Sequence, residues 1–457
     1  MNDDILRSLH PDCTDWAALG PTKRDAAIRA SAMAAENDKH KRTSDWSKGF
    51  NRRTFLKAGM GVGVATLGHQ LVTSRVSYSA SAAPSTGTLV VIFLRGGMDG
   101  LSLLTPVEDP YLLDKRPDIA ARSSATDPLI AMGRNFGLHP SMKPLQGLIS
   151  QNKVAVVPAV STPDLTRSHF QAQDCLERGS STSLTTGWLD RVLEVAGAGT
   201  TFRSVSVGGT LPRSLMGASQ SLAMYNLDSL RIDVEDDEVA ATRDALESLY
   251  TGLDHPIGAQ AGLALGALDT AKAIRDARPA HPAVTYPQDS NFADALSSLA
   301  ELIKAQVGVR VACIDVGGWD THTGMGTVDD GDMKRQLDEL ATSLKAFTDD
   351  LGSNLDSTTI VTMSEFGRRV EQNASGGTDH GHGGAVLVIG GGVKGGVQGR
   401  WDGLSDANLA NDEGDVPGWN DYRDILTEVV TKRLGISQGA MSTVFPAWTP
   451  HAIGVMA

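Results

Sequence analysis

The chain has 457 residues, of which 41% are apolar and 21% are charged. This length and composition are typical of a soluble globular protein with a large buried core. The formal net charge of −13 argues against binding to nucleic acid or to anionic membrane surfaces, because like charges repel. No apolar run is long enough to predict a permanent membrane span.

The N-terminal part of the chain is predicted to be an export signal rather than part of the fold. Residues 51–57 read NRRTFLK, and an apolar, glycine-rich stretch and the small-residue segment SYSASAAP follow them. This order resembles a twin-arginine signal, in which Arg52 and Arg53 form the arginine pair. We therefore expect a signal region with a long polar leader at residues 1–82. The twin-arginine export machinery would be its partner, and residues 83–457 would be a periplasmic or extracellular domain.

The predicted mature chain is more acidic than the whole. Without residues 1–82, 29 basic residues remain against 46 acidic ones, which gives a net charge near −17. Such a balance favours metal cations as partners and argues again against nucleic acid. Two cysteines, Cys175 and Cys313, remain in this part, and their spacing predicts buried free thiols rather than a disulfide framework or a zinc knuckle.

Five short apolar runs predict the strands of a buried sheet. In chain order they read TLVVIFL, KVAVVPAV, VRVACIDV, TTIVTM and AVLVIG. Because each run is apolar at nearly every position, both faces of the sheet must be covered. Helical periodicity marks the longer stretches between the runs, as at residues 332–352, which end in glycine, and along a stripe from Phe292 to Ile303. We predict one α/β domain with a mainly parallel central sheet and helices on both faces.

Ionisable or nucleophilic residues follow four of the five predicted strands. Since the carboxyl ends of parallel strands meet at one edge of a sheet, we expect these side chains to gather there. The four exits carry Asp99 with Ser102, Ser168 with His169, Asp320 with His322, and Glu365 with Arg368.

A glycine-flanked segment, GTDHGHGGA at residues 377–385, adds three further candidate ligands. Glycine flanks let adjacent side chains converge on one ion, and carboxylates brought together need a cation to neutralise them. Neighbours in an extended chain point apart, so His380 and His382 are expected to share a face more readily than Asp379 and His380. We expect His382, with His380 as the alternative, to complete a metal site with Asp320. The alternative interpretation is an ordinary polar loop.

The motifs, in this order, resemble those of the alkaline phosphatase and sulfatase superfamily. More closely, FLRGGMDGLSLLTP, TRSHFQAQDCLERG, GGWDTHTG, MSEFGRR and GTDHGHGG are similar to an exported bacterial family, domain-of-unknown-function family 1501. The resemblance extends from about Thr88 to the C-terminus. It implies an alkaline phosphatase-like fold and a metal-dependent hydrolase whose substrate is a small anionic phosphate or sulfate ester.

The resemblance also implies roles for individual residues. Ser168, at a helix start that favours a bound anion, would be the nucleophile, and Arg167 or Arg368 would stabilise the anion. Divalent metal ions would be required, with zinc, calcium, manganese and iron all compatible with the sequence. The implied metal ligands are Asp99, Asp320, His322, Glu365, Asp379, His380 and His382.

Two features depart from the superfamily pattern. Phe366 follows Glu365 where an Asp-His pair is common, so a second metal would need the loop histidines as ligands. Ser168 lacks the cysteine-centred maturation pattern of many sulfatases. Ser102 is an alternative nucleophile, and further site candidates are His139 and His169. The alternatives to hydrolysis are a non-catalytic metal- or ligand-binding protein and a redox metalloprotein.

Overall fold

The computed structural model describes residues 87–123, 127–250, 256–409 and 414–457. The predicted signal region and its arginine pair lie outside these residues. Most of the described chain belongs to one compact unit, whereas residues 233–250 belong to another, in which α11 spans Val239–Tyr250. Among the described helices, none combines the length and the apolar character needed to cross a membrane.

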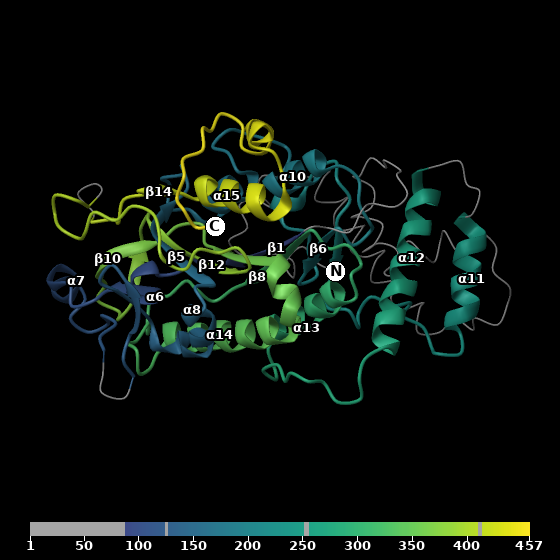
Figure 1. The fold of residues 1–457 in the computed structure, drawn as a ribbon, viewed down its shortest axis with the longest axis horizontal. Coiled ribbons are helices and arrows are strands. Elements are labelled where there is room, and N and C mark those ends of the chain that lie inside the picture. Colours follow the sequence, from purple (N-terminus) through teal and green to yellow (C-terminus); the bar gives the residue numbers. More distant parts are fainter. Residues whose placement is uncertain (1–86, 124–126, 251–255, 410–413) are drawn as a thin grey trace, which may run out of the picture. The chain divides into compact units, whose positions relative to one another are not determined.

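A nine-stranded sheet forms the centre of the large unit. Figure 1 shows this sheet between helices that lie on its two sides. Its order is β13-β5-β12-β9-β1-β8-β6-β7, and β14 pairs with β5. Only β12 runs antiparallel to its neighbours in this sheet, so the prediction of a mainly parallel sheet is confirmed. The strands are β1 (Thr88–Leu94), β5 (Val154–Ser161), β6 (Ser204–Val207), β7 (Leu222–Met224), β8 (Val311–Val316), β9 (Thr358–Met363), β12 (Gly384–Gly390), β13 (Gly396–Val397) and β14 (Asn420–Asp421).

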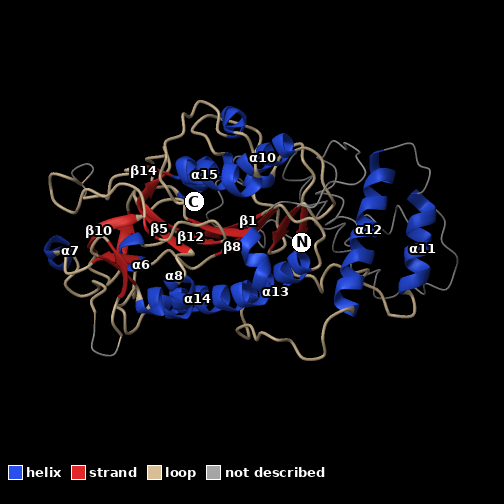
Figure 2. Ribbon diagram, in the orientation of Figure 1, coloured by secondary structure: helices blue, strands red, loops and turns tan. Residues whose placement is uncertain are grey.

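The central strand β1 shows why these runs are apolar throughout. Val90, Ile92 and Leu94 pack into one core, and the alternate residues Leu89, Val91 and Phe93 pack into another. Helices α13 (Asn291–Lys304) and α14 (Asp332–Leu351) cover the first face, and α10 (Trp188–Ala196) and α15 (Tyr422–Leu434) cover the second (Figure 2). With both faces covered, every residue of β1 is buried.

The helices follow the predicted periodicity. In α14 the predicted apolar stripe is buried, and Gly352 caps the helix with a φ of 53°, a backbone conformation that favours glycine. The thiols of Cys175 and Cys313 are buried and free, as predicted. The remaining helices are α6 (Gly100–Leu103), α7 (Pro110–Lys115), α8 (Gln146–Ser150), α9 (His169–Arg178), α12 (Pro256–Asp276), α16 (Met441–Val444) and the 3-10 turns η1 (Pro140–Leu145), η2 (Arg213–Leu215), η3 (Gly352–Ser357) and η4 (Gln438–Ala440).

Two small sheets accompany the central one. The first contains β2 (Leu104–Pro106), β3 (Ile130–Gly133) and β4 (Phe136–Leu138). The second is a hairpin of β10 (Arg368–Gln372) and β11 (Thr378–His380), which follows β9 and leads directly into β12. Arg368 and His380 stand opposite each other in this hairpin. The hairpin therefore carries the histidine segment to residues that follow β9.

Candidate metal centre

Three side chains from distant parts of the sequence form a compact group at the exits of the central strands. His169 begins α9 after β5, Asp320 follows β8, and His380 ends β11. Their potential ligand atoms all lie within 4.8 Å of one another. Residues that follow two of the predicted strands, β5 and β8, thus lie close together, as predicted. The third member of the group comes from the β10–β11 hairpin.

His322 adds a third imidazole to this group. Its Nε2 lies 3.1 Å from Oδ1 of Asp320 and 3.0 Å from Nε2 of His380. The Nε2 of His380 lies 3.3 Å from the same Oδ1, and Nε2 of His169 lies 3.6 Å from Oδ2. All three imidazoles therefore turn Nε2 toward the carboxylate of Asp320.

The other ring nitrogen of each histidine faces an oxygen. Nδ1 of His169 lies 2.7 Å from Oε1 of Glu365. Nδ1 of His322 lies 3.3 Å from Oδ1 of Asp379, and Nδ1 of His380 lies 3.0 Å from the carbonyl oxygen of Arg167. In the neutral tautomer that donates Nδ1–H to this oxygen, Nε2 keeps its lone pair and can bind a cation. Metal-binding histidines are held in this way.

These tautomers leave lone pairs facing each other. In the Nδ1–H tautomer, neither Nε2 of His322 nor Nε2 of His380 has a proton to donate across their 3.0 Å separation. The Nε2 of His169 is buried and has no hydrogen-bond partner among the described residues. Two imidazole nitrogens bound to one tetrahedral ion would lie roughly 3.3 Å apart, given metal–nitrogen distances of about 2.0–2.1 Å. The geometry therefore fits a cation held by His169, His380 and Asp320, with His322 beside Asp320 and His380.

Arg368 fixes the carboxylate of this group from the buried side. Its guanidinium donates to Asp320 Oδ1 at 2.5 Å and to the carbonyls of Gly97 and Thr378 at 2.6 and 2.9 Å. Burial alone would raise the pKa of Asp320, but the contact with Arg368 lowers it below the usual value. Because Arg368 is 2% exposed and bound to the protein, it positions Asp320 and is not available to stabilise a substrate anion as the sequence predicted.

Glu365 contacts the group through His169 and is not one of the residues around the Asp320 carboxylate. Besides contacting His169, Oε1 accepts from the backbone N–H of Gly96 at 3.0 Å and from the amide of Gln173 at 2.9 Å. Burial opposes ionisation, but these donors hold the pKa of Glu365 below its usual value. The carboxylate therefore orients His169. Because Glu365 does not bind a metal in this arrangement, Phe366 beside it needs no metal-binding atom either.

Asp99 does not join the group. It is fully buried, and its carboxylate accepts from Nη1 and Nη2 of Arg116 at 3.1 and 2.8 Å and from the backbone N–H of Ser102 at 2.7 Å. Burial would raise the pKa of Asp99, but Arg116 holds it below the usual value. A guanidinium thus neutralises the carboxylate that the sequence assigned to a metal.

His382 also lies elsewhere, so the expectation that it shares a face with His380 is not met. Its Nε2 faces Gly418, where an added Cβ would come within 2.9 Å of it. The chain changes partner around this residue, because the N–H of Gly381 donates to Gly367 and that of Gly383 donates to Val416. The regular alternation of an extended strand therefore does not apply between the two histidines.

The predicted nucleophile and its neighbour begin α9. Ser168 is the N-cap residue of this helix, and its side chain makes no capping hydrogen bond. Arg167 has a φ of 55°, and its guanidinium pairs with Asp415 at 2.5 Å while its carbonyl contacts His380. Arg167 thus contacts His380 through its backbone, while Asp415 holds its guanidinium.

The remaining candidates lie outside the group or at its edge. Ser102 lies in the short helix α6, is 5% exposed, and places its hydroxyl 3.5 Å from Arg116. His139 caps η1 by accepting from the N–H of Ser141, and burial lowers the pKa of His139 to about 4. Asp379 contacts the group through Nδ1 of His322.

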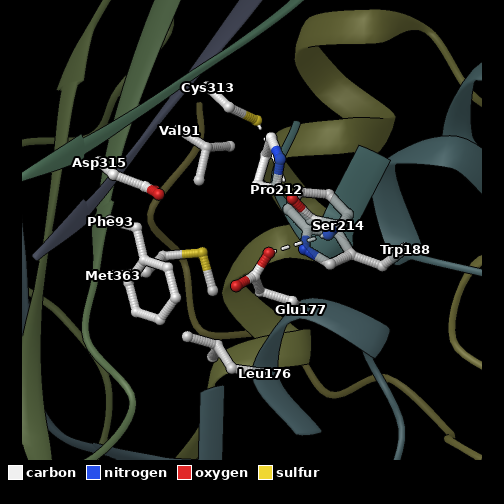
Figure 3. A pocket seen from close by; sticks show the side chains of 10 residues that line it. All are labelled: Val91, Phe93, Leu176, Glu177, Trp188, Pro212, Ser214, Cys313, Asp315 and Met363. Carbon is white, nitrogen blue, oxygen red and sulfur yellow. Dashed lines mark hydrogen bonds between the residues drawn. The ribbon is translucent and has the colours of Figure 1, made fainter. Parts of the chain in front are cut away.

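A small cavity lies in the second core, away from this group (Figure 3). Its volume is about 20 Å³, and Glu177 at its wall accepts from the N–H of Ser214 at 2.9 Å. Glu177 also pairs with Arg95 at 3.0 Å, and burial raises the pKa of Glu177. Such a volume accommodates one water molecule but no ester substrate. The cavity is lined by Val91, Phe93, Leu176, Glu177, Trp188, Pro212, Ser214, Cys313, Asp315 and Met363.

Comparison with known proteins gives a family and two structural likenesses. No curated protein matches the sequence. A sulfatase, PsFucS1 from Pseudoalteromonas sp., is 13% identical over 77% of this chain and 68% of its own, with a TM-score of 0.32. An alkaline phosphatase from the Antarctic bacterium TAB5 is 10% identical over 68% of this chain and 93% of its own, with a TM-score of 0.27. The model of the family described as "Protein of unknown function (DUF1501)" matches residues 87–413, so the chain belongs to the DUF1501 family.

Proposed function

We propose that this protein is a metal-dependent hydrolase of phosphate or sulfate esters that acts outside the cytoplasm. The convergence of three imidazole Nε2 atoms on one carboxylate is the observation that carries this proposal. The residues that would hold the ion are His169, Asp320 and His380, with His322 beside Asp320 and His380. A donor set rich in imidazole favours zinc, iron or manganese over calcium, which takes oxygen ligands. A divalent ion held there supplies positive charge that polarises an ester and favours ionisation of a nucleophile.

The start of α9 supports an anionic substrate. The helix is ten residues long and begins at His169, one of the proposed ligands. The N–H groups of a first helical turn have no intrahelical acceptors, and the helix dipole adds partial positive charge there. Phosphate and sulfate are bound readily at such positions. Since Ser168 makes no capping bond, its hydroxyl remains available for attack on the phosphorus or sulfur atom.

Replacing Ser168 by alanine tests this assignment. We expect turnover of 4-nitrophenyl phosphate or 4-nitrophenyl sulfate to fall by about 10³-fold or more while the metal content stays unchanged, because only the nucleophile is lost. The matched variant Ser102→Ala should keep its activity, since Ser102 belongs to the Arg116 cluster. Activity that survives in Ser168→Ala, or an equal loss in both variants, would reverse the assignment.

Metal dependence is tested on the same substrates. Chelation should abolish turnover, and adding back a divalent ion should restore it. Turnover that persists without metal contradicts the proposal. A bound ion without turnover of either ester would favour the non-catalytic alternative, and an ion that cycles between oxidation states would favour the redox alternative.

Export through the twin-arginine machinery is the second part of the proposal. The NRRTFLK motif supports it, although residues 1–86 lie outside the described part of the chain. A reporter fused to residues 1–90 should reach the periplasm, and Arg52→Lys combined with Arg53→Lys should stop it, because the motif depends on the guanidinium pair. Reporter activity is measured in the periplasmic fraction. Undiminished export of the double variant would eliminate this part of the proposal.

A further inference from the structure

We propose that the substrate bound at the start of α9 carries a large apolar group, and that Leu165 and Phe170 bind this group. The inference rests on the proposed function, in which Ser168 attacks a phosphate or sulfate ester. Phe170 and Leu165 are the most exposed large apolar side chains in the described part of the chain, at 86% and 74%. Consecutive Cα atoms are about 3.8 Å apart, so the Cα atoms of both residues lie within about 12 Å of that of Ser168.

The loop that carries Leu165 is held by hydrogen bonds on both sides of this residue. The carboxylate of Asp164 accepts from the N–H of Thr166 at 3.0 Å and from its hydroxyl at 2.6 Å. The same hydroxyl oxygen accepts from the N–H of Ser168 at 3.3 Å, which connects the loop to the start of α9. Leu165 is therefore held in an exposed position by its two neighbours.

The polar side chains between Leu165 and Phe170 make contacts within the protein. The Thr166 hydroxyl donates to the loop itself, and the guanidinium of Arg167 pairs with Asp415 at 2.5 Å. A sugar bound here would place hydroxyl groups against two apolar side chains, and burying such groups without hydrogen bonds is unfavourable. An apolar group would instead remove exposed apolar surface from water, which is favourable.

The start of α9 thus combines an anion-binding part with an apolar part. The first turn contains no acidic residue, and its N–H groups favour an anion. Phe170 lies in the same turn, at an exposed position where helices normally carry polar residues. Single exposed apolar residues are common, but two that flank the proposed nucleophile indicate a contact surface. An amphiphile, with an anionic ester group and an apolar chain, matches both parts.

Two phosphonates that differ in chain length test this inference without requiring turnover. Octylphosphonate and ethylphosphonate carry the same anionic group, joined to the chain by a carbon–phosphorus bond that ester hydrolysis does not cleave. Binding of each to the purified full-length protein is measured by isothermal titration calorimetry. We expect the Kd of octylphosphonate to be lower by about tenfold or more, because the longer chain buries more apolar surface against the two side chains.

Serine variants of the two side chains assign the preference to them. Leu165→Ser and Phe170→Ser should each reduce the ratio of the two Kd values, and the double variant should reduce it to about twofold or less. Both positions are exposed, so these substitutions should leave the fold intact. Tyr225→Ser is the matched control and should keep the wild-type ratio. Tyr225 is 71% exposed and follows β7, from which β6, β8, β1, β9 and β12 separate β5 in the sheet.

Three results would overturn the inference: equal Kd values in the wild-type protein, no binding of either phosphonate, or an unchanged ratio in the double variant. A wild-type dimer that the double variant converts to a monomer, without a chain-length preference, would assign the two side chains to a second copy of the chain. Analytical ultracentrifugation measures this. A preference for octylphosphonate without turnover of either nitrophenyl ester would support the apolar contact and contradict only the proposed hydrolase. Turnover without a preference would contradict only the apolar contact.

Discussion

Replacing Asp320 by alanine is expected to remove the bound metal and to lower ester turnover by about 10³-fold or more. Asp320 is the carboxylate toward which all three Nε2 atoms turn, at distances between 3.1 and 3.6 Å. Its loss removes both a ligand and the negative charge that favours a cation, and it leaves the guanidinium of Arg368 without its carboxylate. The measurements are metal content by elemental mass spectrometry and turnover of the two nitrophenyl esters.

The matched control for this variant is Asp315→Ala. Asp315 lies on β8, five positions before Asp320 in the same segment, and pairs with Arg95 at 2.9 Å. It should keep both its metal and its turnover, because it faces the small cavity rather than the metal group. Full metal occupancy in Asp320→Ala would show that the ion binds elsewhere.

Replacing Arg116 by methionine is expected to give the largest loss of stability. Arg116 is 1% exposed and neutralises the fully buried Asp99 through two hydrogen bonds, at 2.8 and 3.1 Å. It also donates to the carbonyls of Arg369 and Val370. Removing one partner of a buried ion pair leaves the other charge unpaired, which lowers the free energy of unfolding by about 3–5 kcal/mol. Urea-induced unfolding measures this loss.

Two companion variants complete the stability test. Combining Arg116→Met with Asp99→Asn should recover part of the loss, because no unpaired charge then remains buried. Lys153→Met breaks an exposed ion pair with Asp356 and should leave the unfolding midpoint nearly unchanged. An Arg116→Met variant with the midpoint of the wild type would show that the buried pair does not stabilise the fold.

The fold was predictable because its signals are local. The strand TTIVTM is observed with the bounds of the apolar run, and α14 ends before the predicted glycine. The edge of the sheet that carries the candidate site residues was predictable from topology, because the carboxyl ends of parallel strands lie at one edge. The antiparallel direction of β12 was not predictable, because it depends on the β10–β11 hairpin that returns the chain.

Individual site residues were harder to predict because their roles depend on partners far along the chain. The sequence suggested Asp99 as a metal ligand, but in the structure Arg116, 17 positions later, neutralises its carboxylate. Glu365 became a support for His169, 196 positions away. The sequence favoured Ser168 over the adjacent His169. The position of His169 after a strand and at the start of a helix was the signal for a site residue. The proximity of its Nε2 to Asp320 arises only when the chain folds, so the sequence alone does not show it.

Metal content of the purified protein and its histidine variants tests the central claim most directly. The proposed site predicts about one transition-metal ion per chain in the wild-type protein. His169→Ala should lose most of this metal, whereas His382→Ala should retain it, because His382 faces Gly418 instead of Asp320. A wild-type protein that binds no metal, or equal metal content in the two variants, would contradict the assignment of His169, Asp320, His322 and His380 as the metal centre.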